Sequence, residues 1–94
     1  MREYELVYIL DPNLEEEQAA GITEGVSGVV RNLKGELGEV KPWGRRKLAY
    51  PINNFREGNY IEMHFKMETS AVAELERGLR LNESVIRYLV TKKD

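Results

Sequence analysis

Hydrophobic and polar residues alternate at the start of the chain, from Glu3 to Leu10. This period of two predicts a β-strand with two distinct faces. One face carries Tyr4, Leu6, Tyr8 and Leu10, and the other carries Glu3, Glu5, Val7 and Ile9. Since Val7 and Ile9 make the second face partly apolar, we expect this strand in the interior of a sheet. Asp11-Pro12-Asn13 then ends the alternation.

Residues 14–34 have apolar side chains at the spacing of a helix. The stripe consists of Ala19, Ile22, Val26, Val29, Val30 and Leu33. Asn13 is the expected cap, because its side chain can accept a hydrogen bond from the first turn. The helix also contains a set of glycines on one side, Gly21, Gly25 and Gly28. Each costs about 1 kcal/mol relative to alanine, so either a neighbour approaches closely there or the helix simply tolerates them.

Two extended segments follow. Residues 36–52 predict a strand at a sheet edge, because Pro42 lacks a donor and Gly44 permits a bulge. Residues 53–58 predict a turn or loop, and residues 59–67 alternate again. In this third strand Ile61, Met63, Phe65 and Met67 lie opposite Tyr60, Glu62, His64 and Lys66. We expect the second and third strands to pair as a hairpin.

The last third of the chain predicts one helix and one strand. Thr69 or Ser70 can cap a helix that runs to Leu81, and residues 85–91 alternate with β-branched and aromatic side chains. The order βαββαβ, in a chain long enough for about one domain, predicts a single α+β domain over residues 1–94. We expect a ferredoxin-like sandwich, a four-stranded antiparallel sheet with two helices on one face. Its open face would carry Val7, Ile9, Tyr60, Glu62, His64, Arg87 and Leu89.

Composition supports a folded, water-soluble chain, with 41% hydrophobic and 32% charged residues. The absence of cysteine excludes a disulfide framework, a thiolate metal site and a cysteine nucleophile. The amino terminus has charges where a signal peptide needs an apolar run, and no stretch approaches the ~20 apolar residues of a membrane span. We therefore expect the chain in the cytosol.

Charge is distributed unevenly behind a net value of -2. Residues 1–39 contain nine acids and three bases, whereas residues 40–94 contain eleven bases and seven acids. The segment 40–56 contains no acid, and its bases are Lys41, Arg45, Arg46, Lys47 and Arg56. Such polarity allows one region of the molecule to attract phosphate although the whole is weakly acidic.

The sequence gives little support for an enzymatic function. His64 is the only histidine, which excludes a metal site built from several histidines, and we expect it to be a contact or solvated residue. The loop after the first strand lacks a glycine-rich phosphate cradle. Consecutive helical carboxylates at Glu15 to Glu17 diverge by about 100° each, so they suit the helix dipole better than a cation. We expect no catalysis, no cofactor and no metal.

The basic segment is better suited to RNA. From Lys41 to Ile52 it combines positive charge for phosphate, guanidinium planes for stacking and aromatic rings. The alternative is that these residues protect the sheet edge, because lysine and proline on edge strands prevent aggregation. An RNA-recognition module with the same element order would place several aromatic rings on the third strand, but residues 57–65 offer only Tyr60 on the open face. Base stacking across the sheet is therefore not expected.

Three separated blocks of the sequence are distinctive. They are Met1-Arg2-Glu3-Tyr4-Glu5 with Leu10-Asp11-Pro12-Asn13-Leu14, then Gly44-Arg45-Arg46-Lys47-Leu48-Ala49-Tyr50-Pro51-Ile52, and Arg77 through Val90. Together they resemble the bacterial small-subunit ribosomal protein S6 family. The resemblance runs over the whole chain. It implies a βαββαβ structural component of the small ribosomal subunit that binds the central domain of small-subunit ribosomal RNA together with a basic partner, ribosomal protein S18.

Combining the charge pattern with this resemblance gives two sets of candidate residues. For RNA we expect Arg2, Lys41, Arg45, Arg46, Lys47 and Arg87. For partner-protein or mixed contacts we expect Tyr4, Val7, Ile9, Trp43, Tyr50, Tyr60, His64 and Leu89, with Tyr4 and Tyr50 as alternative core residues. The rival hypothesis is a protein-interaction or small-ligand regulatory module that uses the open sheet face and the edge strand. An acylphosphatase-like enzyme is a distant third.

Overall fold

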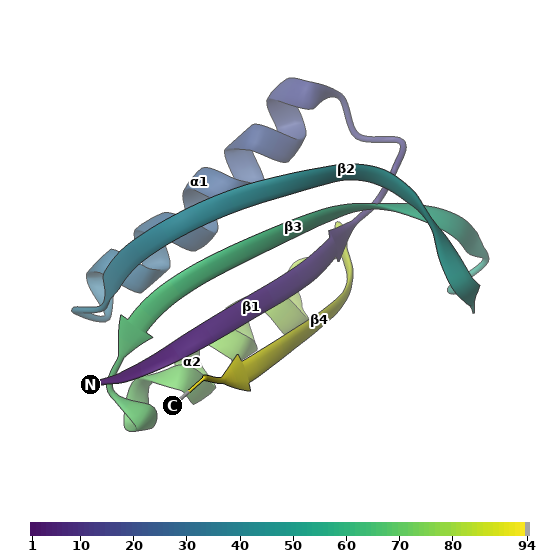
Figure 1. Ribbon diagram of the computed structural model, residues 1–94. Coiled ribbons are helices and arrows are strands. Elements are labelled where there is room, and N and C mark those ends of the chain that lie inside the picture. The colour runs from purple at the N-terminus through teal and green to yellow at the C-terminus, as the bar shows by residue number, and fades with distance from the viewer. Residues whose placement is uncertain (94) are drawn as a thin grey trace.

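The computed structural model describes residues 1–93, in the order βαββαβ (Figure 1). The first half contains β1 (Arg2–Leu10), α1 (Glu16–Asn32) and β2 (Glu36–Ile52), and the second half contains β3 (Phe55–Met67), α2 (Thr69–Leu81) and β4 (Val85–Lys92). Within the described part of the chain, neither helix is long and apolar enough to cross a membrane.

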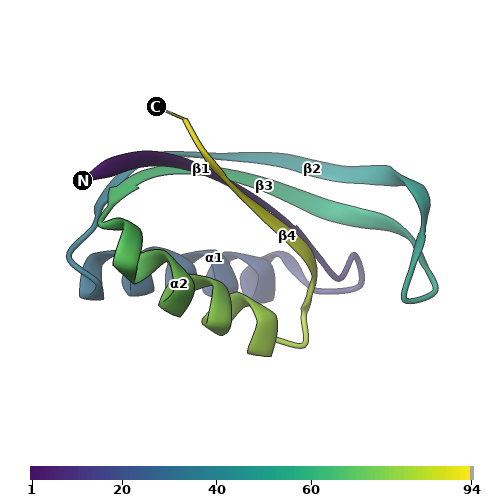
Figure 2. The ribbon, with the colours of Figure 1, turned by 90° about the horizontal axis from the view of Figure 1, so that it is seen from below.

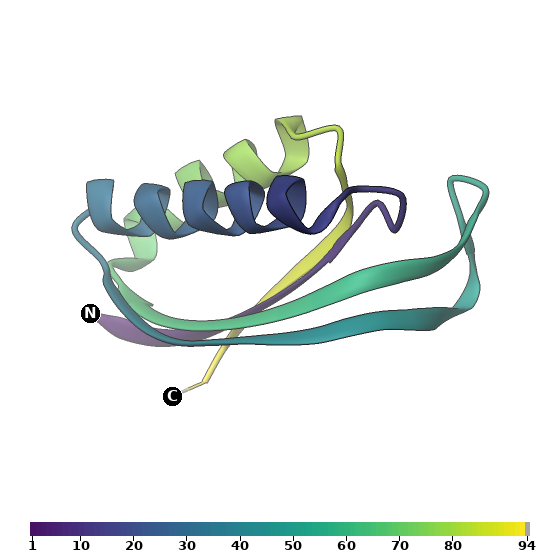
Figure 3. The same ribbon diagram turned by 90° about the horizontal axis from the view of Figure 1, so that it is seen from above.

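The strands form one antiparallel sheet in the order β2-β3-β1-β4. Both helices lie against the same face, and the opposite face is free of helices (Figure 2). This arrangement confirms the predicted sandwich, the interior position of the first strand and the edge position of the second. The β2–β3 hairpin extends past the ends of the helices (Figure 3).

The core lies between the sheet and the helices. Its buried residues are Tyr4, Leu6, Tyr8, Leu10, Ala19, Val26, Val30, Ile61, Met63, Phe65, Met67, Leu75 and Leu79. Two tyrosines reach the edge of the core, where each hydroxyl has a hydrogen-bond partner. The Tyr8 hydroxyl donates to Thr23 Oγ1 at 2.8 Å, and the Tyr4 hydroxyl donates to Thr69 Oγ1 at 3.1 Å. Burial raises the pKa of Tyr8, because it disfavours the charged phenolate.

Both predicted helix caps are wrong by a few residues. Asn13 does not cap α1, because the helix begins only at Glu16; Asn13 lies in a local turn, where its N–H donates to Asp11 Oδ1 at 2.8 Å. The cap is instead Glu15, whose N–H donates to Gln18 Oε1 at 3.0 Å. The cap of α2 is Glu68, one residue before the predicted Thr69.

The hairpin turn is tighter than predicted. The loop expected over residues 53–58 is reduced to Asn53 and Asn54, and β3 begins at Phe55. Both asparagines have positive φ, 49° and 70°. Asparagine tolerates this left-handed conformation, which matches the twist of a two-residue hairpin turn. Consequently β2 and β3 stay paired beyond the part of the sheet that the helices cover.

Glycines behave differently in α1 and in β3. A Cβ at any of Gly21, Gly25 or Gly28 would meet nothing within 4 Å, so no neighbour approaches α1 closely there. This favours the interpretation of a helix that simply tolerates them. At Gly58, by contrast, a Cβ would stand 2.1 Å from Ile9 Cγ2. The missing side chain lets Ile9 bury itself on the otherwise open face, where it is 8% exposed.

Candidate binding face of the sheet

The helix-free face carries an aromatic stack on the hairpin. Trp43 and Tyr60 lie with ring centroids 5.6 Å apart and planes inclined by 6°, and the Arg46 guanidinium lies 5.6 Å from the Trp43 centroid. The bulge at Gly44, with φ of 85°, is the register shift that brings Trp43 over the neighbouring strand. The indole N–H donates to Glu62 Oε1 at 3.1 Å. The stack is therefore fixed in position while Trp43 stays 40% exposed.

A second cation and ring pair lies near the tip of the hairpin. Arg87 on β4 donates to the Tyr50 hydroxyl at 2.8 Å, and its guanidinium lies 6.0 Å from the Tyr50 centroid. The Tyr50 side chain is 57% exposed, so it does not occupy the alternative core position. Together with Arg46 and Trp43, this pair forms a surface of two guanidinium groups over aromatic rings.

Neighbouring bases on β2 point to opposite faces. Arg46 pairs with Gly58 and Arg45 with Asn59, so the alternation of the strand separates the two side chains. Arg45 points toward the helix side, where it donates to the Pro12 carbonyl at 2.6 Å. Lys47 is two residues after Arg45 on the same strand, so alternation places its side chain on the same side of the sheet as that of Arg45. The basic segment therefore presents charge to both sides of the sheet edge.

The remaining predicted residues are more scattered. Arg2 lies at the end of β1 that pairs with Met67, far along the strand from Leu10, which pairs with Asn59 beside the basic segment. Tyr4 is in the core, the alternative considered for it, and Ile9 is buried, so little of either side chain is available to a partner. Leu89 is 64% exposed, whereas Val7 and His64 are half-buried.

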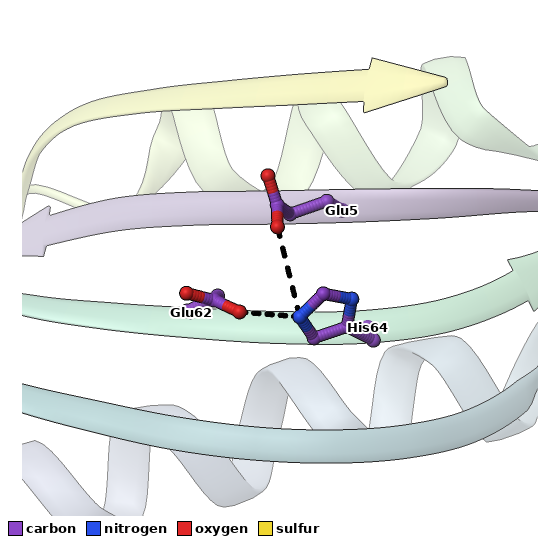
Figure 4. A group of neighbouring side chains, drawn as sticks. All are labelled: Glu5, Glu62 and His64. Carbon is purple, nitrogen blue, oxygen red and sulfur yellow. Dashed lines mark hydrogen bonds and ion pairs between the residues drawn. The ribbon is translucent and has the colours of Figure 1, made fainter. Parts of the chain in front are cut away.

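Next to the stack, three ionisable side chains meet at the centre of the open face (Figure 4). His64 lies between Glu62, to which Nε2 is hydrogen-bonded, and Glu5, whose Oε1 is 3.6 Å from Nε2. Lys93 Nζ approaches the other ring nitrogen, Nδ1, at 3.3 Å. The His64 hydrogen bond is the largest cause of the lowered pKa of Glu62, with the Trp43 bond as a smaller contribution.

Glu5 is the member of this cluster that sequence reasoning missed. Glu62 and His64 share a face of β3 by alternation, and both were expected on the open face. Glu5 joins them because it is the register partner of His64 on β1. Alternation along a strand indicates which face a side chain lies on, but it does not give the register between strands. The only sequence signal for Glu5 was therefore that it is an acid on the open face of an interior strand.

Comparison with known proteins identifies the family. A family model described as ribosomal protein S6 matches residues 3–92. The chain belongs to the ribosomal protein S6 family. This confirms the resemblance noted in the sequence, and with it the expected place of the chain in the small ribosomal subunit and the cytoplasm. The family is one of ribosomal structural proteins, while the absence of catalysis stays a prediction.

Individual relatives agree over nearly the whole chain. Small ribosomal subunit protein bS6 of Geotalea daltonii is 47% identical over 92 residues, which are 98% of this chain and 72% of that relative. The bS6 protein of Halalkalibacterium halodurans is 45% identical over 94 residues, covering 100% of this chain and 99% of that one. A crystal structure of 30S ribosomal protein S6 from Thermotoga maritima superimposes with a TM-score of 0.94 at 32% identity, covering 98% and 87% of the two chains.

Proposed function

We propose that the chain binds the central domain of small-subunit ribosomal RNA together with the basic ribosomal protein S18. The observation that carries this proposal is the open face of the hairpin, where Arg46 lies over the stacked rings of Trp43 and Tyr60. Arginine planes and aromatic rings are suited to unpaired bases, and guanidinium groups pair with phosphate in a forked geometry. A sheet face without helices leaves these groups accessible.

The basic segment is the proposed RNA-binding element. Arg46 and Arg87 are offered on the open face, while Arg45 and Lys47 project from the other side of the same edge strand. An edge strand with charge on both sides can lie in a groove of folded RNA and reach phosphates on either wall. Lys41 continues the strip, although it also lies 3.8 Å from Glu39 Oε1. Arg2 lies at the far end of β1 and fits this surface least well.

Partner protein and RNA would share the face. The exposed apolar surface of Leu89, with Val7 and the rings of Tyr50 and Tyr60 nearby on the sheet, suits a protein contact. Acidic side chains of α1 and the net charge of -2 would attract a basic protein and repel RNA. We therefore expect the isolated chain to bind RNA weakly and the basic partner to increase its affinity.

The first experiment measures RNA binding with and without the partner. A fluorescent fragment of the central domain is titrated with the chain alone, with S18 alone and with both, at several salt concentrations. Binding by the pair should be at least about tenfold tighter than by either protein, because the partner neutralises the acids that repel phosphate. Equally tight binding by the isolated chain would contradict the shared-face proposal.

A second experiment removes the charge of the hairpin. In the presence of S18, the double variant Arg45→Ala, Arg46→Ala should bind the RNA fragment more weakly and lose about one unit of salt slope for each phosphate contact removed. The double variant Arg77→Ala, Arg80→Ala on α2 is the matched control, since it removes the same charge from the helix side. If both variants retain the parent affinity and salt slope, the basic segment does not bind RNA.

A further inference from the structure

We infer that Glu5, Glu62 and His64 form a binding site for a divalent transition-metal ion of the Zn²⁺ class on the open face of the sheet. The inference does not depend on RNA or partner binding. Each residue offers one ligand atom, and the three ligand atoms all lie within 4.8 Å of one another. One imidazole with two carboxylates is a ligand set that zinc accepts. The sequence led us to expect no metal, but its single histidine excludes only sites built from several histidines.

Register places the three ligands on rigid backbone. Glu5 of β1 and His64 of β3 are directly paired, and Glu62 precedes His64 by one period of the same strand. Both strands are interior to the sheet, so each is paired on both sides. All three side chains project from the helix-free face and converge on the His64 Nε2 atom (Figure 4). Sites built on strands hold their ligands more accurately than sites built on loops.

The distances fit an ion with only a small movement of side chains. Zinc lies about 2.0–2.2 Å from nitrogen and oxygen ligands, so two ligands of a tetrahedral ion stand about 3.4 Å apart. His64 Nε2 and Glu5 Oε1 are 3.6 Å apart. His64 and Glu62 are in direct hydrogen bond and would have to separate slightly, and water would complete the coordination on the exposed side.

A second layer of contacts orients the ligands. Trp43 Nε1 donates to Glu62 Oε1, which leaves Oε2 directed at His64. Hydrogen bonds of this kind fix the orientation of metal ligands and raise affinity. The side chains of Glu62 and His64 are 13% and 20% exposed, and that of Glu5 is 36% exposed. Partial shelter strengthens the attraction of two carboxylates for a dication, whose charge they balance.

Protons and Lys93 are the competitors of the ion. When His64 is protonated, the imidazolium is held by the two carboxylates, and a metal must replace that proton at Nε2. Lys93 Nζ approaches Nδ1 at 3.3 Å, which favours the tautomer with hydrogen on Nε2 and therefore opposes metal binding. Affinity should consequently rise when the lysine cation is removed.

The test uses the full chain, freed of metal with a chelator and titrated with Co²⁺ and Zn²⁺ at neutral pH. Co²⁺ should give visible absorption bands of low-symmetry coordination at one ion per chain, and Zn²⁺ should displace it. Because the chain contains one histidine and one tryptophan, paramagnetic shifts of the His64 ring protons and quenching of Trp43 fluorescence locate the ion without any mutation. If the His64 ring signals do not move at saturating Co²⁺, the proposed site does not bind metal.

Variants sharpen the assignment. Glu5→Gln, Glu62→Gln and His64→Gln should each lower Zn²⁺ affinity by at least about a hundredfold, Trp43→Phe by about tenfold, and Lys93→Met should raise it. Glu3→Gln is the matched control, because Glu3 lies on the same face of β1 and its Oε1 forms an ion pair with Lys66 Nζ at 3.9 Å. Circular dichroism verifies the folding of each variant. Equal losses for Glu3→Gln and Glu5→Gln would overturn the proposal, since that result indicates general attraction to surface acids.

Discussion

The two faces of the sheet are made by the same strands but are held together by different interactions. On the helix side, Leu6, Tyr8 and Met63 are fully buried in a continuous apolar core. On the open side, the contacts are ring stacks, guanidinium pairs and a histidine between two carboxylates. Because burial of apolar surface is the main source of folding stability, we expect the first face to account for most of it. The second face is rich in groups that can recognise charged ligands, and we expect its exposed contacts to contribute less.

The largest difference between the faces should come from truncating leucines. Leu6→Ala removes a fully buried side chain and leaves a cavity, so it should lower the free energy of unfolding by about 2–5 kcal/mol. Leu89→Ala removes the same atoms from a residue that is 64% exposed, and its effect should stay within about 0.5 kcal/mol. Urea denaturation of both variants measures the contrast. Similar losses would show that the open face also contributes to the core.

A smaller effect should come from filling the space of Gly58. In Gly58→Ala the new Cβ would meet Ile9 Cγ2 at 2.1 Å, and the resulting overpacking should cost about 1–3 kcal/mol. Gly21→Ala is the control, because its Cβ would meet nothing within 4 Å and alanine favours a helix interior by about 1 kcal/mol. Thermal denaturation should therefore shift in opposite directions. A stabilised Gly58→Ala chain would contradict the close packing of Ile9 on this face.

Removing one hydroxyl from each face should have a still smaller effect. Tyr8→Phe loses a hydrogen bond to Thr23 inside the core region and should cost about 0.5–1.5 kcal/mol. Tyr50→Phe loses the hydrogen bond from Arg87 at an exposed position, where water can replace it, and should change the free energy of unfolding by less than about 0.5 kcal/mol. Chemical denaturation of the two variants tests this order, and a larger loss for Tyr50→Phe would reverse it.

The smallest effect concerns pH. The pKa of Glu62 is lowered in the folded chain, first by the hydrogen bond with His64, so its carboxylate stabilises the fold above its ordinary pKa of 4.5. That contribution is lost as the pH falls through the lower folded pKa. In chelator-treated buffer, the stability difference between the parent and Glu62→Gln should therefore shrink on acidification. A difference that is constant across this range would show that the contact with His64 does not favour the ionised form.

These two faces also explain which features the sequence could predict. Alternation in β1 and β3 assigned Leu6 and Met63 to the core and Tyr60 and His64 to the open face, because a burial pattern is local and repeats every second residue. The hairpin pairing was predictable for the same reason. Element ends were less predictable. At α1 the bond between Glu15 and Gln18 takes the place of the cap expected from Asn13, and Glu68 caps α2 without a side-chain hydrogen bond.

The candidate site was only partly predictable, because it depends on register and on one bulge. Charge identified the basic segment, but the face that each of Arg45 and Arg46 takes depends on the bulge at Gly44, where the register with β3 shifts. The stack of Trp43 on Tyr60 requires the same bulge. Likewise, a shift of one residue in the pairing of β1 with β3 would remove Glu5 from His64. Long-range pairing of this kind is not encoded in the periodicity of a single strand.

The most direct test of the open face compares two pairs of arginines in one binding titration. With S18 present, Arg46→Ala, Arg87→Ala removes the two guanidinium groups that lie over rings, and Arg77→Ala, Arg80→Ala removes two from α2. The open-face pair should weaken binding of the ribosomal RNA fragment by at least about tenfold, as expected for lost charge-assisted contacts, while the helix pair leaves it unchanged. Equal affinities for the two double variants, or a greater loss for the helix pair, would contradict the assignment of binding to the open face.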